Sequence, residues 1–102
     1  MLSRRGLRTD RRRTRGVERH SITANYTVVV AQLCRYHVFV LDAARDVDIA
    51  CLKDPEAWIG LMNDASSPAD ITVKDGGTTV GTLTPGDASE FTPGSTGVIE
   101  PL

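Results

Sequence analysis

The chain has 102 residues, of which 40% are hydrophobic and 25% are charged, and these values fit one small globular domain. A chain of this length buries only about 60–65% of the surface that its unfolded form exposes, which excludes a large multidomain enzyme and a solenoid of several long repeats. No apolar run approaches the roughly 20 residues that a membrane-spanning helix needs. Residues 1–20 lack the apolar segment of a secretory signal, so we expect no secretion.

Charge is distributed unevenly along the chain. Residues 1–20 contain eight arginines and two acids, for a net charge of +6, whereas residues 21–102 contain four basic and eleven acidic side chains, for a net charge of −7. This division predicts a basic extended arm over residues 1–20 and a folded body over residues 21–102. The arm has too few apolar side chains to order itself, so we expect it to become ordered only against a partner.

The basic side chains of the arm are all arginines, which favour bidentate pairing with carboxylate or phosphate groups. We therefore predict that the arm binds the partner. The candidate partner-binding residues are Arg4, Arg5, Arg8, Arg11, Arg12, Arg13, Arg15 and Arg19.

Short runs of β-branched, aromatic and alternating residues follow the arm and predict strands. In chain order they cover residues 24–33, 36–41, 47–52, 57–62, 69–74, 78–83, 88–92 and 98–99. Residues 75–77 supply the glycines that a tight hairpin turn requires, and residues 85–87 form a second turn. Val80 and Leu83 have opposite parity, which predicts a bulge near Gly81.

About seven short strands at intervals near ten residues, without a helical period, predict an all-β fold, a small antiparallel β-sandwich or barrel. Residues 54–61 are a helical alternative, a single turn opened by Pro55, although Trp58 and Ile59 also continue well as a strand. Trp58 is expected to be largely buried as the largest apolar side chain of a thin core. The predicted core residues are Val28, Val30, Ile49, Ile71, Val73, Val80, Leu83 and Phe91.

Patterns typical of catalysis or metal binding are missing from the sequence. His20 and His37 stand alone, without the spacing of a zinc motif, and His37 is expected on the exposed side of a strand. Cys34 and Cys51 form no C-x-x-C motif and are expected to be buried free thiols, with a bridge between them as the alternative.

Other polar groups also lack a ligand-binding order. The acids Asp42, Asp46, Asp48 and Asp54 do not follow the order of a calcium loop, so we interpret them as solvated turn carboxylates. The glycines lie between strands and not before a helix, which disfavours a phosphate-binding loop. We predict that the protein is not an enzyme and holds no metal or cofactor.

The segment from residue 36 to residue 92 carries a series of motifs in a fixed order. LDA at residues 41–43 ends a strand, and residues 59–63 begin with isoleucine and end with asparagine. ITVKDGGTT at residues 71–79 forms a hairpin, and TLTPGD at residues 82–87 is followed by Phe91. This series resembles β-rich modules of tailed-bacteriophage virion proteins, both small head-decoration (cement) proteins and fibre modules. The resemblance covers somewhat over half of the chain and none of the arm.

The resemblance implies a structural virion protein, and 102 residues favour a capsid decoration protein over a whole tail fibre. Such a protein is assembled in the host cytoplasm and binds the outer surface of the phage head. The arm would cross carboxylates of neighbouring subunits of the major capsid protein and stabilise the shell against packed DNA. We expect a homo-oligomer, with a trimer favoured and a dimer as the alternative.

Two other functions remain open at this point. A phage head or tail fibre or adaptor protein would have the same β-rich body. A nucleic-acid-binding accessory protein is the second alternative, because arginine also pairs with phosphate. The arm has no aromatic residue to stack on bases and the body is acidic, which disfavours nucleic acid. We expect no membrane partner.

Overall fold

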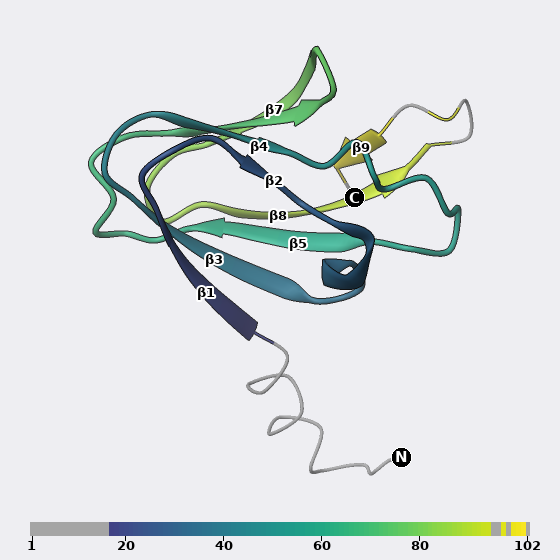
Figure 1. The fold of residues 1–102 in the computed structure, drawn as a ribbon, viewed down its shortest axis with the longest axis horizontal. Coiled ribbons are helices and arrows are strands. Elements are labelled where there is room, and N and C mark those ends of the chain that lie inside the picture. The colour runs from purple at the N-terminus through teal and green to yellow at the C-terminus, as the bar shows by residue number, and fades with distance from the viewer. Residues whose placement is uncertain (1–16, 95–96, 98, 102) are drawn as a thin grey trace, which may run out of the picture.

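The computed structural model describes residues 17–94, 97 and 99–101. These residues form nine strands, a short 3-10 helix and turns, so the all-β prediction is confirmed (Figure 1). No helix within the described residues is long and apolar enough to cross a membrane. The elements are β1 (Val17–Ile22), β2 (Tyr26–Thr27), η1 (Val30–Gln32), β3 (Tyr36–Leu41), β4 (Arg45–Asp48), β5 (Ile59–Asn63), β6 (Ile71–Asp75), β7 (Thr78–Leu83), β8 (Ala88–Pro93) and β9 (Ile99–Pro101).

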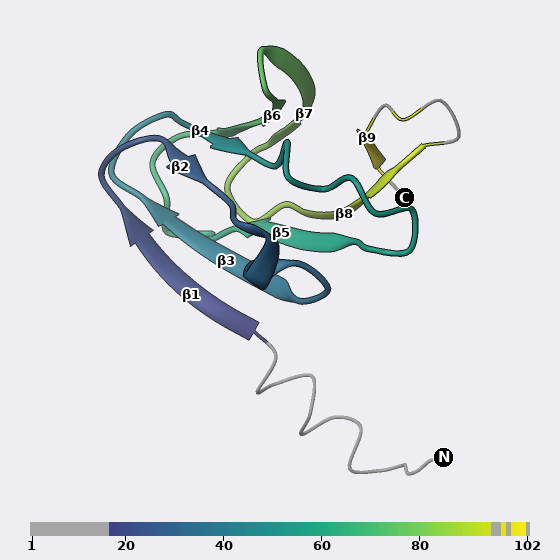
Figure 2. The same ribbon diagram turned by 45° about the vertical axis from the view of Figure 1, so that its right-hand side comes forward.

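The strands form two separate sheets, and the chain passes from one sheet to the other after each of the first five strands. One sheet has the order β1-β3-β5-β8-β9 and the other the order β2-β4-β6-β7, as Figures 1 and 2 show. We call them sheet A and sheet B. The pairs β1–β3, β3–β5, β2–β4 and β4–β6 are all parallel.

The predicted antiparallel arrangement is therefore wrong for four of the seven strand pairs, and the barrel alternative is not formed. A parallel pair needs a connection of a dozen or more residues, commonly a helix. Here the connection between two parallel strands is a strand of the opposite sheet, reached through links as short as residues 23–25 and 42–44. Residues 24–25 of the first link fall within a predicted strand, and a link this short does not by itself distinguish a hairpin from a crossing between sheets.

Antiparallel pairing is confined to the C-terminal part of the described chain. β6 pairs with β7 across the predicted turn at residues 75–77, where Gly76 has φ 62°. Val73 faces Gly81 and Lys74 faces Thr79, which leaves Val80 as the extra residue of a bulge. The bulge predicted near Gly81 is confirmed. β8 then pairs with β5 on one side and β9 on the other.

Buried side chains of both sheets meet in one core between the layers. The predicted core residues Val28, Ile49, Ile71, Val73, Leu83 and Phe91 are buried, and Val80 is partly buried against them. Val30 is 69% exposed, so its assignment to the core is wrong. β2 ends at Thr27 and Val30 begins the 3-10 helix, which breaks the alternation of a strand over residues 24–33.

Trp58 is mostly buried, as predicted, and lies just before β5 with its ring edge-on to Tyr36, 5.1 Å between centroids. Residues 54–61 do not form a helix; Ala57 closes a tight turn onto the carbonyl of Asp54, and β5 begins at Ile59. β1 covers Val17–Ile22, so the predicted division between arm and body at residue 20 falls within a strand.

Candidate functional site

Of the predicted partner-binding arginines, the structure describes one. Arg4, Arg5, Arg8, Arg11, Arg12, Arg13 and Arg15 lie outside the described residues. Arg19 lies on β1 with 63% of its side chain exposed, and its Nη2 is 3.3 Å from Oδ1 of Asp64. Asp64 follows β5, and hydrogen bonds from Ser66, followed by Arg19, lower the pKa of its carboxyl. Arg19 therefore connects the edge strand β1 to the turn that follows β5.

The face of sheet A that points away from the core carries an apolar groove of about 530 Å³. Side chains alternate along a strand, so the neighbours of core residues such as Phe39 and Leu61 point to this face. Val17, Tyr36 and Met62 are exposed large hydrophobics there. The side chains of this face that line the groove are Val17, Tyr36, Val38, Met62, Ala88 and Glu90.

Tyr36 is held across this groove by its neighbours in the sheet. Tyr36 faces Gly60 on β5, and Gly60 faces Glu90 on β8. A Cβ at Gly60 would lie 2.2 Å from the Tyr36 ring, so only glycine leaves room for the ring. The Tyr36 hydroxyl donates a hydrogen bond to Glu90. The aromatic ring is thus fixed in one position on the floor of the groove.

The two histidines, which were expected to stand alone, lie together on the core side of sheet A. Nε2 of His20 is 2.9 Å from Nδ1 of His37, and His37 is 1% exposed, so its expected surface position is wrong. Parallel pairing of β1 with β3 places Glu18 opposite His37, with His20 two residues further on the same face. Within the described residues, Glu18, His20 and His37 form a group that could hold a metal ion.

The surroundings of Glu18 and His20 lower the pKa values of both groups. A hydrogen bond from Arg35 lowers the pKa of Glu18 and keeps its carboxylate ionised. Burial lowers the pKa of His20, and the nearby His37 lowers it further. Both effects disfavour the protonated form of His20.

The sequence did not predict this group, because Glu18, His20 and His37 do not have the spacing of a known metal-binding motif. Glu18 and His20 share a face through the two-residue period of a strand, but they lie in the basic arm as the composition defined it. His37 joins them through the parallel register of β1 and β3. The alternation of Glu18, His20 and Ile22 before a buried strand was the one available signal.

The cysteines are both free, as expected, but they are not both buried. Cys34 is exposed in a turn with φ 64°, and its amide donates to the carbonyl of Trp58 at 2.6 Å. Cys51 is partly buried, and burial raises the pKa of its thiol. The Cys51 thiol is therefore not activated by its surroundings.

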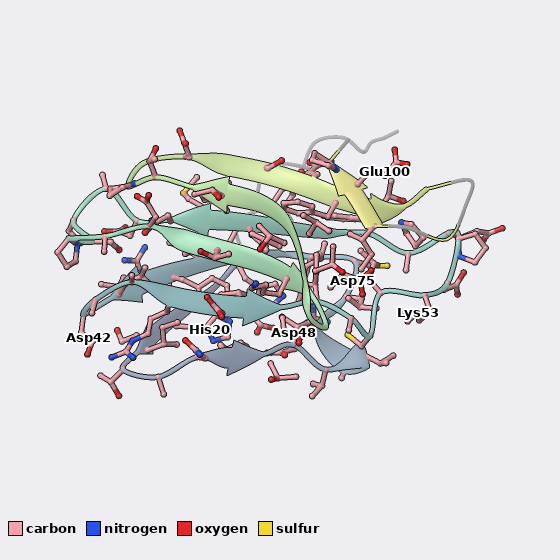
Figure 3. All side chains as sticks on the ribbon, turned by 90° about the horizontal axis from the view of Figure 1, so that it is seen from above. His20, Asp42, Asp48, Lys53, Asp75 and Glu100 are labelled. Carbon is pink, nitrogen blue, oxygen red and sulfur yellow. The ribbon has the colours of Figure 1, made fainter. Side chains whose placement is uncertain are left out.

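Two of the acids that were interpreted as solvated turn carboxylates accept hydrogen bonds within this chain, and one of them, Asp48, ends β4 and is not in a turn. Asp42 forms a bidentate pair with Arg45 at 2.9 Å, and Oδ1 of Asp48 accepts hydrogen bonds from the amides of Ala50 and Gly76. Figure 3 shows Asp42 at one end of the body and Asp48 nearer its middle. Both carboxylates thus have hydrogen-bond partners of their own within this chain.

Compared with known proteins, the chain matches no family model, no curated protein and no solved structure. Two features of sheet A bear on its function: the apolar groove on its outer face and the edge strand β1, whose Val17 lines that groove.

Proposed function

We propose that the protein is a structural protein of a tailed-phage virion, a capsid decoration protein that binds the outer surface of the head and stabilises it. The resemblance of residues 36–92 to decoration and fibre modules supports this proposal, as does the all-β body. The partner is the major capsid protein, and the proposed location is the outer capsid surface, reached after assembly in the host cytoplasm. No catalytic step is part of the proposal.

The observation that carries the proposal is the position of Val17. Val17 is the first described residue after the arginine-rich segment, and it also lines the groove of sheet A. A partner seated in the groove therefore lies beside the point where the basic segment enters the body. An apolar segment of capsid protein flanked by carboxylates would suit both regions. Its apolar side chains would fill the groove, and its carboxylates would pair bidentately with the arginines.

Protein is favoured over nucleic acid as the partner by the pairing of the described arginines. Arg19, Arg35 and Arg45 each pair with a carboxylate of this chain. The groove has an apolar lining with Glu90 at its wall, which suits an apolar side chain better than a phosphate. A phage head or tail fibre or adaptor protein is the second candidate, since the same surfaces would suit a tail partner. A trimer is the proposed assembly, with a dimer as the alternative.

Cosedimentation with DNA-free shells of the phage that encodes the chain tests this proposal. The full chain is expected to sediment with shells and not to bind free duplex DNA. Replacing Arg11, Arg12 and Arg13 together with alanine should weaken shell binding, and Met62→Glu should do so by placing a charge in the groove. Thr79→Glu is the matched control, because Thr79 is exposed on sheet B.

Two results would reject the proposal. The first is binding of the full chain to duplex DNA with no binding to shells. The second is shell binding that neither the arginine variant nor Met62→Glu weakens. Binding to isolated tails in place of shells would favour the fibre or adaptor function.

A further inference from the structure

We propose that Glu18, His20 and His37 bind a zinc ion at the β1–β3 edge of sheet A. The proposal is independent of the proposed virion function. It rests on the side chains of two parallel strands and on the groups that orient them.

The three donor atoms form a triangle close to the size that zinc requires. His20 Nε2 and His37 Nδ1 are 2.9 Å apart, and Oε1 of Glu18 lies 3.8 Å from the first and 3.7 Å from the second. Tetrahedral zinc with bonds of about 2.0–2.1 Å holds its donors about 3.3–3.4 Å apart. Each side of the triangle is within about half an ångström of that separation, so small side-chain shifts complete the site.

The ring of His37 is oriented by a backbone group behind it. Its Nε2 lies 2.7 Å from the carbonyl oxygen of Gln32. A carbonyl only accepts hydrogen bonds, so Nε2 donates to it, and Nδ1 is the ring nitrogen that faces His20 and Glu18. Zinc-ligating histidines commonly have such a carbonyl partner on the other ring nitrogen.

The other two ligands are oriented as well. Arg35 hydrogen-bonds Oε2 of Glu18 and leaves Oε1 toward the histidines. The ring of His20 stacks on Phe39 at 4.9 Å between centroids and contacts Tyr26 at 5.2 Å. Both contacts fix the plane of the ring and so the direction of Nε2. All three donors are thus positioned before a metal binds, which reduces the entropy lost on binding.

Three ligands leave one position of the tetrahedron for water or for a group of a binding partner. Glu18 and His20 are partly exposed, so this position is accessible from solvent. The ligands join the edge strand β1 to β3, and a bound ion would therefore stabilise the strand that the arginine-rich segment enters. The alternative is a plain hydrogen-bonded pair, in which Nε2–H of His20 donates to Nδ1 of His37.

Zinc titration of the full chain, stripped with EDTA and free of a histidine tag, tests the proposal. Calorimetry is expected to give one Zn²⁺ per chain, and the melting temperature should rise with zinc concentration because the ion binds the folded state. Glu18→Gln should weaken binding by at least the roughly 10–100-fold that loss of a second-shell partner costs. Glu56→Gln, at an exposed turn residue, is the matched control and should bind as the original chain does.

Nitrogen NMR of the histidines locates the ion and separates this site from the thiols. Zinc should shift Nε2 of His20 and Nδ1 of His37 and leave Nε2 of His37 protonated. The same titration of a Cys34→Ser, Cys51→Ser variant should give the same stoichiometry. The proposal is wrong if the full chain binds no zinc at micromolar concentrations, if binding disappears with the cysteines, or if Glu18→Gln binds zinc as tightly as the original chain. Any of these results leaves the hydrogen-bonded pair, and none bears on capsid binding.

Discussion

Asn63 is a buried side chain that joins three parts of the fold, and the change Asn63→Asp tests its role. Asn63 ends β5 and is fully buried. Its Nδ2 donates two hydrogen bonds of 2.9 Å, to the carbonyls of Ala69 and Leu83. Aspartate has nearly the same shape, so the substitution leaves no cavity and changes only the donors.

The expected loss of stability follows from the proton that the introduced carboxyl must hold. An ionised carboxylate at this position would face the carbonyl oxygens of Ala69 and Leu83, which repel it. The carboxyl therefore stays protonated in the folded state, and it donates one hydrogen bond where the amide of Asn63 donates two. The carbonyl left without a partner costs about 1–3 kcal/mol. Holding a carboxyl with an ordinary pKa near 3.9 protonated at pH 7 costs about 4 kcal/mol more. The total, about 5–7 kcal/mol, is comparable to the whole stability of a domain this size, about 5–15 kcal/mol.

The pH dependence distinguishes this mechanism from simple misfit. The introduced carboxyl has a higher pKa in the folded than in the unfolded state, so the penalty grows as pH rises above about 4. Urea unfolding of Asn63→Asp and of the original chain at pH 4 and pH 7 measures it. Relative to the original chain, the variant should lose about 1–3 kcal/mol at pH 4.

Asn25→Asp is the control for Asn63→Asp. Asn25 is exposed and its Oδ1 accepts a hydrogen bond from the amide of Asp46, a role that a carboxylate keeps. Its change in stability should stay within about 0.5 kcal/mol at both pH values. Equal losses for Asn63→Asp at pH 4 and pH 7 would refute the reasoning, because the carboxyl would then reach water.

Two further predictions concern the groove and the thiols. Gly60→Ala should destabilise the fold by about 1–3 kcal/mol in urea unfolding, because the added methyl displaces the ring of Tyr36. Gly77→Ala is the control, since nothing lies within 4 Å of a Cβ there, and it should change stability by less than about 1 kcal/mol. Equal losses for the two variants would contradict the close packing of Gly60 against Tyr36. Cys34 is exposed and should react with a thiol reagent at pH 7 well before Cys51 does. The reaction rate of Cys51 should rise at higher pH, because burial raises the pKa of its thiol. Equal rates for the two thiols in the folded chain would show that Cys51 is not protected.

The parts of the fold that could be predicted from the sequence are those that local chemistry determines. Gly76 has positive φ and closes the predicted hairpin, and Val80 forms the predicted bulge beside Gly81. Ile71 and Val73 alternate toward the core as their pattern indicates. Turn residues and a two-residue period suffice for such features.

The pairing of strands could not be predicted in the same way. Residues 42–44 link β3 to a strand of the other sheet, although so short a link is equally typical of a hairpin. The parallel register that follows brings Glu18 and His20 to His37. The alternation of side chains in β1 also overlaps the arginine-rich segment, so residues 17–20 were assigned to the arm and not to a strand. The histidine site was missed because its ligands meet only through this long-range pairing.

The alternation of the chain between the two sheets has a consequence for how the protein folds. Each of the first four strands pairs with a strand 19–26 residues further along the chain, whereas β6 and β7 meet across residues 76–77. Closing a short loop costs less entropy than closing a long one, so the β6–β7 hairpin is favoured to form early. During synthesis, β1 leaves the ribosome first and must wait for β3 before it has a neighbour. The arginine-rich segment is therefore synthesised well before β1 can pair with β3. A partner that binds this segment during that interval binds a chain in which sheet A has not yet formed.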